Sequence, residues 1–368
     1  MSETKNPGRG QDYRRRFDAT ISAVLHQGLR IIHADPGLFL AGTRIAYHQK
    51  KAAAIRKEHE DRGLVVPPVM ITSITSQCNL ACGGCYMKHR GATEHPGEMS
   101  PETLASLAGQ AAELGVSVIV IAGGEPLVRK DEIFQLAGAF PEILFPVFTN
   151  GLMIDAGVAD AIAGCRNIVP VISFEGFRAE TDGRRGTGVY DRLLSICGYL
   201  RDRKIFFGCS ITITRENFDC VTGETFIRQM IGAGARVFTF VEYVPIEPGT
   251  DELALAGEQK IMLNSLMSVF GSKFAAIFIG FPGDEEAFGG CLAAGRGFVH
   301  VSPSGDLEPC PAAPLSDANL VHVPLADALR SRLLSRIRDE HGLLTESTGG
   351  CALRANRVLV QQVLSGRK

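Results

Sequence analysis

The chain has 368 residues, of which 45% are hydrophobic and 21% are charged, and its formal net charge is −2 at pH 7. This composition supports a buried core, and the small net charge argues against a nucleic-acid binder held by bulk electrostatics. No apolar run approaches a membrane span, and the polar N-terminus MSETKNPGRGQDYRRRF lacks the apolar core of a signal peptide. We therefore expect a cytoplasmic protein, in which clustered cysteines are more often metal ligands than disulfides.

Residues 1–66 are predicted to form a helical N-terminal extension. Apolar residues from Phe17 to Ile32 recur at helical spacing, and Lys and Arg outnumber Asp and Glu before Pro67 by 12 to 7. We expect this extension to pack on the main domain. A basic helix that lies on a membrane surface is the alternative. The Pro67–Pro68 pair marks the expected boundary.

After this boundary, short apolar segments rich in β-branched residues alternate with helical ones, which predicts parallel strands in a buried sheet. Six such units favour an α/β fold with a partial (β/α)6 TIM-like barrel over residues 67–274. In such folds the chemistry lies at the carboxyl ends of the strands. The predicted strands are 69–75, 117–123, 143–149, 167–174, 205–214 and 236–244, and the predicted helices are 101–114, 130–139, 155–163, 189–201 and 222–233.

The pattern changes after about residue 275. Residues 297–310, GFVHVSPSGDLEPC, predict a hairpin with a Pro-Ser-Gly-Asp turn and a cysteine at its end. A helix is expected around 324–339. We assign residues 275–368 to a small C-terminal domain.

Three cysteines, Cys78, Cys82 and Cys85, lie in the segment SQCNLACGGCYMK after the first predicted strand. A structural zinc site normally has four protein ligands, and with His89 as the fourth a zinc ion is one alternative. A [4Fe–4S] cluster is usually held by four cysteines, so three would leave one iron open to a small molecule. The spacing favours the cluster, and the two glycines before Cys85 allow the backbone to wrap closely around it.

The motif C-x3-C-x2-C-Y after a first strand resembles the signature of the radical S-adenosylmethionine (SAM) superfamily. GGEP at 123–126 is similar to the family's turn that binds the amino group of SAM, since backbone carbonyls and a carboxylate suit an ammonium ion. SFEGFRAETDGRRGTG at 173–188 is similar to the family's fourth-strand region. Each residue alone is also explained by turn chemistry, whereas the motifs in order at successive strand ends are not. The resemblance assigns SAM binding to Tyr86, Gly123, Gly124, Glu125, Pro126, Asn150, Ser173, Glu175, Arg185 and Thr212.

Cys291, Cys310 and Cys351 form a second group near the C-terminus. A glycine five residues before Cys310 resembles the auxiliary-cluster domains, called SPASM or twitch, of many radical SAM enzymes. Because the further cysteines of the full pattern are absent, the resemblance implies one auxiliary [4Fe–4S] cluster held by these three thiolates. A zinc knuckle or three unrelated thiols is the alternative. The candidates for the fourth ligand are a water, the substrate, His300, His322 and Asp317.

The resemblance implies an enzyme that cleaves SAM with an electron from a donor such as flavodoxin or ferredoxin, and whose 5′-deoxyadenosyl radical takes hydrogen from a substrate. We favour a redox-coupled, oxidative modification of a small molecule. Modification of a peptide or protein side chain is one alternative, and a non-catalytic iron–sulfur electron carrier, which would need no SAM pocket, is another. Glu242 and Tyr243, after the sixth strand, are candidates to line the substrate cavity and move a proton. By strand alternation at least one of them faces the outer helices.

Overall fold

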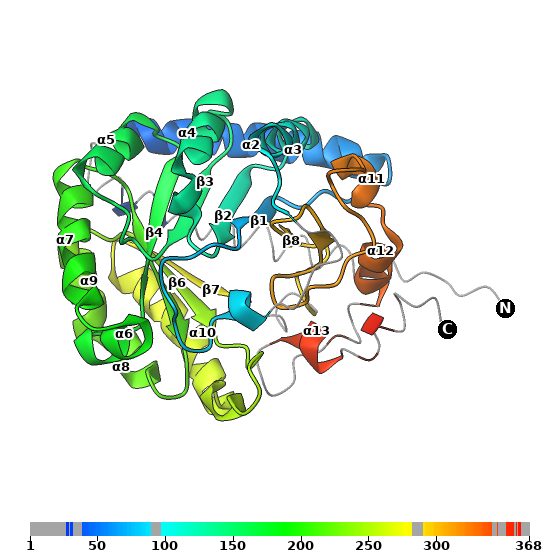
Figure 1. The fold of residues 1–368 in the computed structure, drawn as a ribbon. Coiled ribbons are helices and arrows are strands. Elements are labelled where there is room, and N and C mark those ends of the chain that lie inside the picture. The colour runs from blue at the N-terminus through cyan, green and yellow to red at the C-terminus, as the bar shows by residue number, and fades with distance from the viewer. Residues whose placement is uncertain are drawn as a thin grey trace.

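The structure is a computed structural model that describes residues 27–28, 30–31, 39–89, 97–281, 290–340, 344, 351–356, 358 and 360–361. These residues form an α/β fold around one curled sheet of nine strands (Figure 1). The predicted fold class, a partial TIM-like barrel with a helical N-terminal region, is confirmed. The first helix prediction depends on Phe17, Ile21, Leu25 and Ile32, and these four residues lie outside the described residues.

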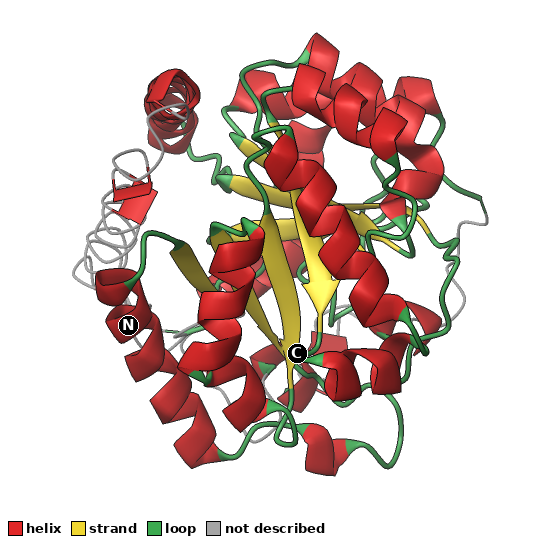
Figure 2. Ribbon diagram, turned by 90° about the vertical axis from the view of Figure 1, so that its left-hand side faces the viewer, coloured by secondary structure: helices red, strands yellow, loops and turns green. Residues whose placement is uncertain are grey.

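Eight of the nine strands run parallel. Their order across the sheet is β7-β6-β5-β4-β3-β2-β1-β8-β9, and only the β8–β9 pair is antiparallel. Helices cover the outer face of the curled sheet, as Figures 1 and 2 show. The strands are β1 (Val69–Thr75), β2 (Val118–Gly123), β3 (Phe145–Thr149), β4 (Ile168–Phe174), β5 (Gly208–Ile213), β6 (Val237–Glu242), β7 (Ile277–Phe281), β8 (Phe298–Val301) and β9 (Leu307–Glu308).

The six predicted strands are all present as β1 to β6, and the predicted C-terminal hairpin is present as β8 and β9. The structure adds β7 as a seventh parallel strand in chain order. It also pairs β8 in parallel with β1, a contact between segments far apart in sequence. Strands on both sides of residue 274 thus belong to one sheet, and the division into domains stays a prediction.

The first and last of the eight parallel strands across the sheet, β7 and β8, meet through side chains. The rings of Phe281 and Phe298 lie 5.1 Å apart, although no backbone ladder joins these strands in the described part of the chain. When the register is followed from strand to strand, Val301 of β8 lies level with Ala276, the residue before β7. Phe281 lies five residues after Ala276, and Phe298 lies three residues before Val301. This offset of about eight residues is the stagger of a TIM-like barrel.

The α-helices are α2 (Phe39–Asp61), α3 (Pro101–Leu114), α4 (Lys130–Ala139), α5 (Ala156–Gly164), α6 (Arg178–Arg185), α7 (Val189–Asp202), α8 (Phe218–Thr222), α9 (Glu224–Ala233), α10 (Gly257–Lys273), α11 (Leu325–Ala328), α12 (Arg332–Asp339) and α13 (Ala352–Ala355). Three of them, α3, α5 and α12, have side-chain N-caps. In α3 the Ser100 side chain accepts from Thr103 N, and Gly115, with φ +86°, is the C-cap.

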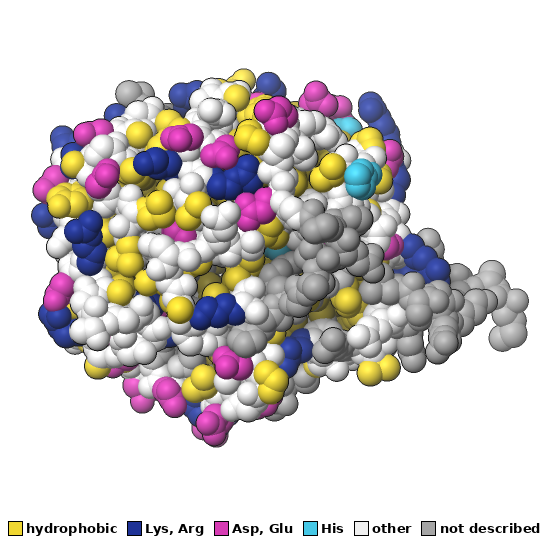
Figure 3. All heavy atoms as spheres, viewed as in Figure 1, with side chains coloured by type: hydrophobic (Ala, Val, Ile, Leu, Met, Phe, Trp, Pro, Cys, Tyr) yellow, Lys and Arg dark blue, Asp and Glu magenta, His cyan; other side chains and the backbone are white. Residues whose placement is uncertain are grey.

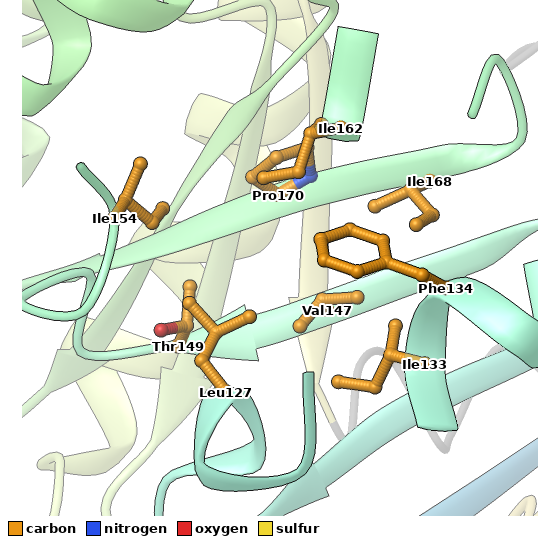
Figure 4. A pocket seen from close by; sticks show the side chains of 9 residues that line it. All are labelled: Leu127, Ile133, Phe134, Val147, Thr149, Ile154, Ile162, Ile168 and Pro170. Carbon is orange, nitrogen blue, oxygen red and sulfur yellow. The ribbon is translucent and has the colours of Figure 1, made fainter. Parts of the chain in front are cut away.

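Packing between the sheet and the outer helices is nearly complete. A cavity of about 10 Å³ lies among side chains of β3, β4, α4 and α5, and of the nine that line it only Thr149 is polar (Figure 4). This is about the volume that one water molecule needs. Because the cavity lies under the helices and is apolar, it is a packing gap and not a ligand site.

The helix α2 confirms the expected packing of the N-terminal region on the main domain. Arg56 Nη1 donates to Gly115 O (2.5 Å), and the Ser117 hydroxyl donates to Gln49 Oε1 (2.7 Å). Both partners lie between α3 and β2, at the amino end of the sheet. The helix is therefore fixed at the end of the barrel opposite to the cysteine loop.

The described surface is mixed in charge. In Figure 3, basic and acidic side chains lie side by side over the described part of this face, as the nearly balanced composition leads one to expect. Among the described residues, no helix combines the length and the hydropathy that crossing a bilayer would require.

Phe238 on β6 tests the packing of the outer face, because its buried ring stacks on Phe278 at 5.0 Å. Phe238→Ala should lower the free energy of unfolding by about 3–5 kcal/mol, since burial is lost and a cavity is left. Anaerobic urea unfolding followed by circular dichroism measures this. Tyr47→Ala, at a side chain 66% exposed, should cost less than about 0.5 kcal/mol. Equal losses in the two variants would contradict this packing.

Candidate active site

The three cysteines of the first loop follow β1 at the carboxyl end of the sheet. Cys78 is exposed, and Cys82 and Cys85 are half-buried. Tyr86 then opens a short 3-10 helix, Tyr86–His89, and is itself half-buried. Residues that follow β2, β3, β4 and β6 all contact this loop or its flanks. The loop thus lies where the strand ends converge, which is the usual place for chemistry in such a fold.

The GGEP turn after β2 holds the start of the loop by backbone hydrogen bonds. Gly124 N donates to Thr75 O (2.8 Å), and Glu125 N donates to Gln77 O (2.7 Å). A Cβ at Gly124 would lie 2.1 Å from Gln77 O, and one at Gly123, where φ is +134°, would lie 2.3 Å from Thr75 O. Only glycine fits at these two positions.

Glu125 is fully buried, and its carboxylate accepts three hydrogen bonds from the protein. Oε1 accepts from Leu127 N (3.0 Å) and Thr149 Oγ1 (2.6 Å), and Oε2 accepts from Asn150 N (2.7 Å). Burial raises the pKa of this carboxyl in spite of the three donors. Pro126, also buried, begins the 3-10 helix Pro126–Arg129. The carboxylate therefore ties the end of β2 to the end of β3.

Asn150 extends this network into the cysteine loop. Its Nδ2 donates to Asn79 Oδ1 (2.7 Å) and lies 3.9 Å from Cys78 Sγ. Leu80 N also donates to Cys78 Sγ (3.4 Å). Hydrogen bonds to ligand sulfurs are one of the levers that set the potential of an iron–sulfur cluster, so the loop has a first set of donors in place.

Glu175, after β4, lies in a buried cluster of charge. Arg185 donates to its Oε1 through Nε (2.9 Å) and Nη2 (2.6 Å), and Arg184 Nη1 lies 2.8 Å from the same oxygen. The other oxygen, Oε2, is buried and has no hydrogen-bond partner among the described residues. Leaving a buried acceptor unsatisfied is costly. A ligand hydroxyl or ammonium group would satisfy it.

Ser173 and Thr212 are half-buried on β4 and β5. Their strand neighbours, Ile172 and Phe174 on β4 and Ile211 and Ile213 on β5, are fully buried under the outer helices. By alternation, both hydroxyls belong to the inner face of the sheet. Asn217 holds the two strand ends together. Its Nδ2 donates to the backbone oxygens of Glu175 and Thr212, each at 2.9 Å.

Glu242 and Tyr243 face opposite ways, as strand alternation predicts. Glu242 Oε2 lies 3.6 Å from Lys260 Nζ on the outer helix α10. Tyr243 is buried and reaches the cysteine loop, where a Cβ at Gly84 would lie 2.7 Å from its hydroxyl oxygen. This hydroxyl donates to Thr250 Oγ1 (3.0 Å). Of the two catalytic candidates, the structure brings only Tyr243 to the loop.

The three thiols of the first loop suit an iron–sulfur cluster, because cysteine thiolates normally hold such clusters and a cubane spreads its ligands over several irons. Burial and the negative charges of Glu125, Cys82 and Cys85 raise the pKa of Cys78. A cationic centre would relieve this crowding. The side chain of His89, the zinc alternative, lies outside the described residues.

The second group of cysteines also comes together. Cys310 is buried just after β9, Cys291 is buried before β8, and Cys351 precedes α13. A hydrogen bond with Cys351, burial, and the charges of Cys351 and Cys291 raise the pKa of Cys310 well above its usual value. Segments from three parts of the C-terminal region thus bring Cys351 and Cys291 within electrostatic reach of Cys310. That the three thiols hold one cluster stays a prediction.

His300 is not available as a fourth ligand to these cysteines, contrary to one of the predicted candidates. It is fully buried, its Nδ1 is 2.6 Å from Glu308 Oε2, and its Nε2 is 2.8 Å from Ser73 Oγ. Both ring nitrogens are therefore used within the protein. Asp317 accepts the backbone N–H of residue 333 in α12 (2.8 Å). His322 is exposed.

Three residues that sequence analysis does not single out help to fix the loop. Arg129 Nη1 donates to Ile74 O in β1 (2.8 Å), Glu98 accepts from Ser76 N (2.8 Å), and Arg184 donates through Nε to a loop carbonyl (3.0 Å). The run GGEPLVR, which ends in Arg129, is a sequence signal that could have marked this arginine. Nothing in the sequence marks Glu98, because its contact depends on how the chain after the loop folds back.

Residues 72–221 match the family model of the radical SAM superfamily. The chain carries a radical SAM domain. Its family uses a [4Fe–4S] cluster and SAM as cofactors, and the matched residues include the cysteine loop, the GGEP turn and the Glu175 cluster.

Relatives of this radical SAM protein act on different kinds of molecule, as their names state. The chain is 28% identical over 320 residues to the mycofactocin maturase MftC of Mycolicibacterium smegmatis, covering 80% of this chain and 77% of that protein. It is 26% identical over 311 residues to the AdoMet-dependent heme synthase of Methanosarcina barkeri, covering 75% and 86%. Among solved structures, Streptococcus suis SuiB bound to S-adenosylmethionine has the same fold, with TM-score 0.62 at 17% identity over 81% of this chain and 73% of that chain.

Gly124→Ala tests the contact between the GGEP turn and the loop. Because the new Cβ would lie 2.1 Å from Gln77 O, the turn must move away, and we expect lost SAM binding and a lower iron content at the first loop. Calorimetric titration with SAM and iron analysis measure these. Gly138→Ala, in α4, meets no atom within 4 Å and is the matched control. If both variants bind SAM like the wild type, the turn does not position the loop.

Proposed function

We propose that this protein is a radical SAM enzyme that carries out a redox-coupled, oxidative modification of a small molecule. One observation supports this most directly. Three cysteines and a buried carboxylate oxygen that has no partner among the described residues lie along the same edge of the sheet, linked by Arg184. A loop for a cluster and an acceptor for a polar ligand are therefore neighbours, as a cluster that binds SAM requires.

The roles follow from the contacts of each side chain. Cys78, Cys82 and Cys85 would hold the cluster. Because the Glu125 carboxylate already accepts three internal hydrogen bonds, attraction for the ammonium group of SAM falls to the backbone carbonyls of the GGEP turn. Glu175 Oε2 is the acceptor for a SAM hydroxyl or ammonium group. The SAM contacts completing this set would be Tyr86, Asn150, Ser173, Arg185 and Thr212.

Bound there, the cluster and SAM would supply radical chemistry for hydrogen abstraction from the substrate, with one electron from a flavodoxin- or ferredoxin-type donor and methionine as the by-product. The chain's own part is placement and exclusion of water. Tyr243 contacts the loop from the β6 side, and its hydroxyl donates to Thr250. In this proposal Tyr243 lines the substrate cavity and moves a proton.

The second cysteine group supports the oxidative outcome. Cys291, Cys310 and Cys351 would hold an auxiliary [4Fe–4S] cluster, which supplies an acceptor for the electron left on the substrate. With His300 used by Glu308 and Ser73, the fourth position falls to His322, Asp317, a water or the substrate. Substrate at that position would be held in fixed relation to the barrel.

The substrate class has two candidates. Similarity to an AdoMet-dependent heme synthase supports a small molecule. Similarity to a mycofactocin maturase supports a peptide side chain instead, so this second candidate is retained. Deuterium transfer into 5′-deoxyadenosine from labelled small molecules and from labelled peptides distinguishes them, because only the true substrate loses its hydrogen to the radical.

Anaerobically reconstituted protein with dithionite should convert SAM to 5′-deoxyadenosine and methionine, measured by liquid chromatography. Cys82→Ala should reduce this conversion to background, because a ligand of the cluster is lost. Cys209→Ala removes a thiol that is fully buried on β5 and should retain the conversion. Wild-type protein that forms neither product, and whose spectrum is unchanged by SAM, would refute the proposal.

Replacing Cys291, Cys310 and Cys351 together with Ala should lower the iron content from about eight to about four per chain, the value for one remaining cubane. A matched control replaces three of the scattered cysteines, Cys165, Cys197 and Cys220, and should keep the iron unchanged. Iron and sulfide analysis after reconstitution measures both. A triple variant with wild-type iron would remove the auxiliary cluster from this account.

A further inference from the structure

We propose that Arg184 is a positioning residue for the iron–sulfur cluster, which clamps the cysteine loop at Gly83 and makes the cluster easier to reduce through its positive charge. This rests on the proposed function, because it needs a cluster on the loop. The family resemblance singles out Arg185, in the Arg-Gly pattern, and leaves its neighbour without a role.

The clamp between α6 and the loop has contacts in both directions. Arg184 Nε donates to Gly83 O (3.0 Å), and Gly83 N donates to Arg184 O (3.4 Å). Gly83 lies between Cys82 and Cys85 in the sequence, so the clamp acts on the part of the loop that sets the positions of two of the three ligands. No other described residue forms both a side-chain and a backbone hydrogen bond with this glycine.

The guanidinium is itself held in place by Glu175. Arg184 Nη1 lies 2.8 Å from Glu175 Oε1, and the side chains are 21% and 2% exposed. Ion pairs screened from water in this way are geometrically well defined, because breaking one leaves a buried charge without a partner. The contact is an ion pair by distance, since Nη1 makes no hydrogen bond of good geometry among the described residues. Glu175 thus keeps the Arg184 charge close to the loop.

The two neighbouring arginines share Glu175 but differ in their second contact. Arg185 donates to Glu175 Oε1, and its charge also offsets part of the rise that burial causes in the pKa of Glu125. Burial alone would lower the pKa of Arg184, but the charge of Glu175, with smaller effects of Cys82 and Cys85, raises it. Arg184 therefore stays cationic, and it is the arginine that contacts the loop between Cys82 and Cys85.

A cation beside a cluster favours the form that carries one more electron. Removal of the Arg184 charge should therefore make the reduction potential of the cluster more negative. Radical SAM chemistry starts from a low-potential reduced cluster, which an external donor must be able to produce. Arg184 would keep that reduced state within reach of the donor while it holds the loop in place.

The test measures the midpoint potential of the SAM-binding cluster. The potential is obtained by redox titration of the electron paramagnetic resonance signal that changes on addition of SAM. Arg184→Gln should shift the reduction equilibrium at least tenfold toward the oxidised form, which is about 59 mV for one electron. Arg184→Lys, which keeps the charge, should stay close to the wild type. Arg178→Gln is the matched control, because it removes the same charge from α6 at an exposed pair with Asp191.

A wild-type potential in Arg184→Gln would overturn the proposal, as would equal shifts in Arg184→Gln and Arg178→Gln. If Arg184→Gln assembles no cluster, recovery of iron and of the wild-type potential in Arg184→Lys supports the proposal, and continued loss of iron in Arg184→Lys overturns the role of the charge. A wild-type protein without any SAM-responsive signal would instead refute the proposed function. The two failures are therefore distinguishable.

Discussion

The close approach of the GGEP turn to residues 75–77 is the contact on which the site depends. Two glycines bring backbone to backbone at a distance that no Cβ permits, so the ends of β1 and β2 form one platform. The buried Glu125 carboxylate extends this platform to β3, and Asn150 extends it to the cysteine loop. The loop is thus placed by the barrel itself, and a rigid support of this kind is what a precise metal site needs.

Charge on the inner edge of the sheet is arranged around Glu175. One oxygen of its carboxylate pairs with two arginines, and the other has no hydrogen-bond partner in the described part of the chain. Because the carboxylate is nearly fully buried, its ion pairs stabilise the site only in a narrow range of geometries. The same carboxylate therefore connects the expected ligand pocket with Arg184 and, through it, with the loop between Cys82 and Cys85. Electrostatics and loop geometry are coupled at this point.

The strand β1 links the two groups of cysteines. It leads directly into the first loop, and it pairs in parallel with β8 of the C-terminal hairpin. Ser73 of β1, His300 of β8 and Glu308 of β9 form a continuous buried hydrogen-bonded chain across this junction. Cys310 follows β9. The separation of the two cysteine groups is consequently fixed by a sheet, and the ring contact of Phe281 with Phe298 supports the same junction from the β7 side.

The sequence by itself determined β1 to β6, the C-terminal hairpin and both cysteine groups, because each depends on local hydrophobic pattern, turn chemistry or ligand spacing. It could not determine that β8 pairs with β1, that both nitrogens of His300 are occupied, that Tyr243 and not Glu242 faces the loop, or that Arg184 reaches Gly83. These depend on register and on contacts between residues far apart in the chain. Only the tertiary structure decided them, since curling of the sheet is what brings such residues together.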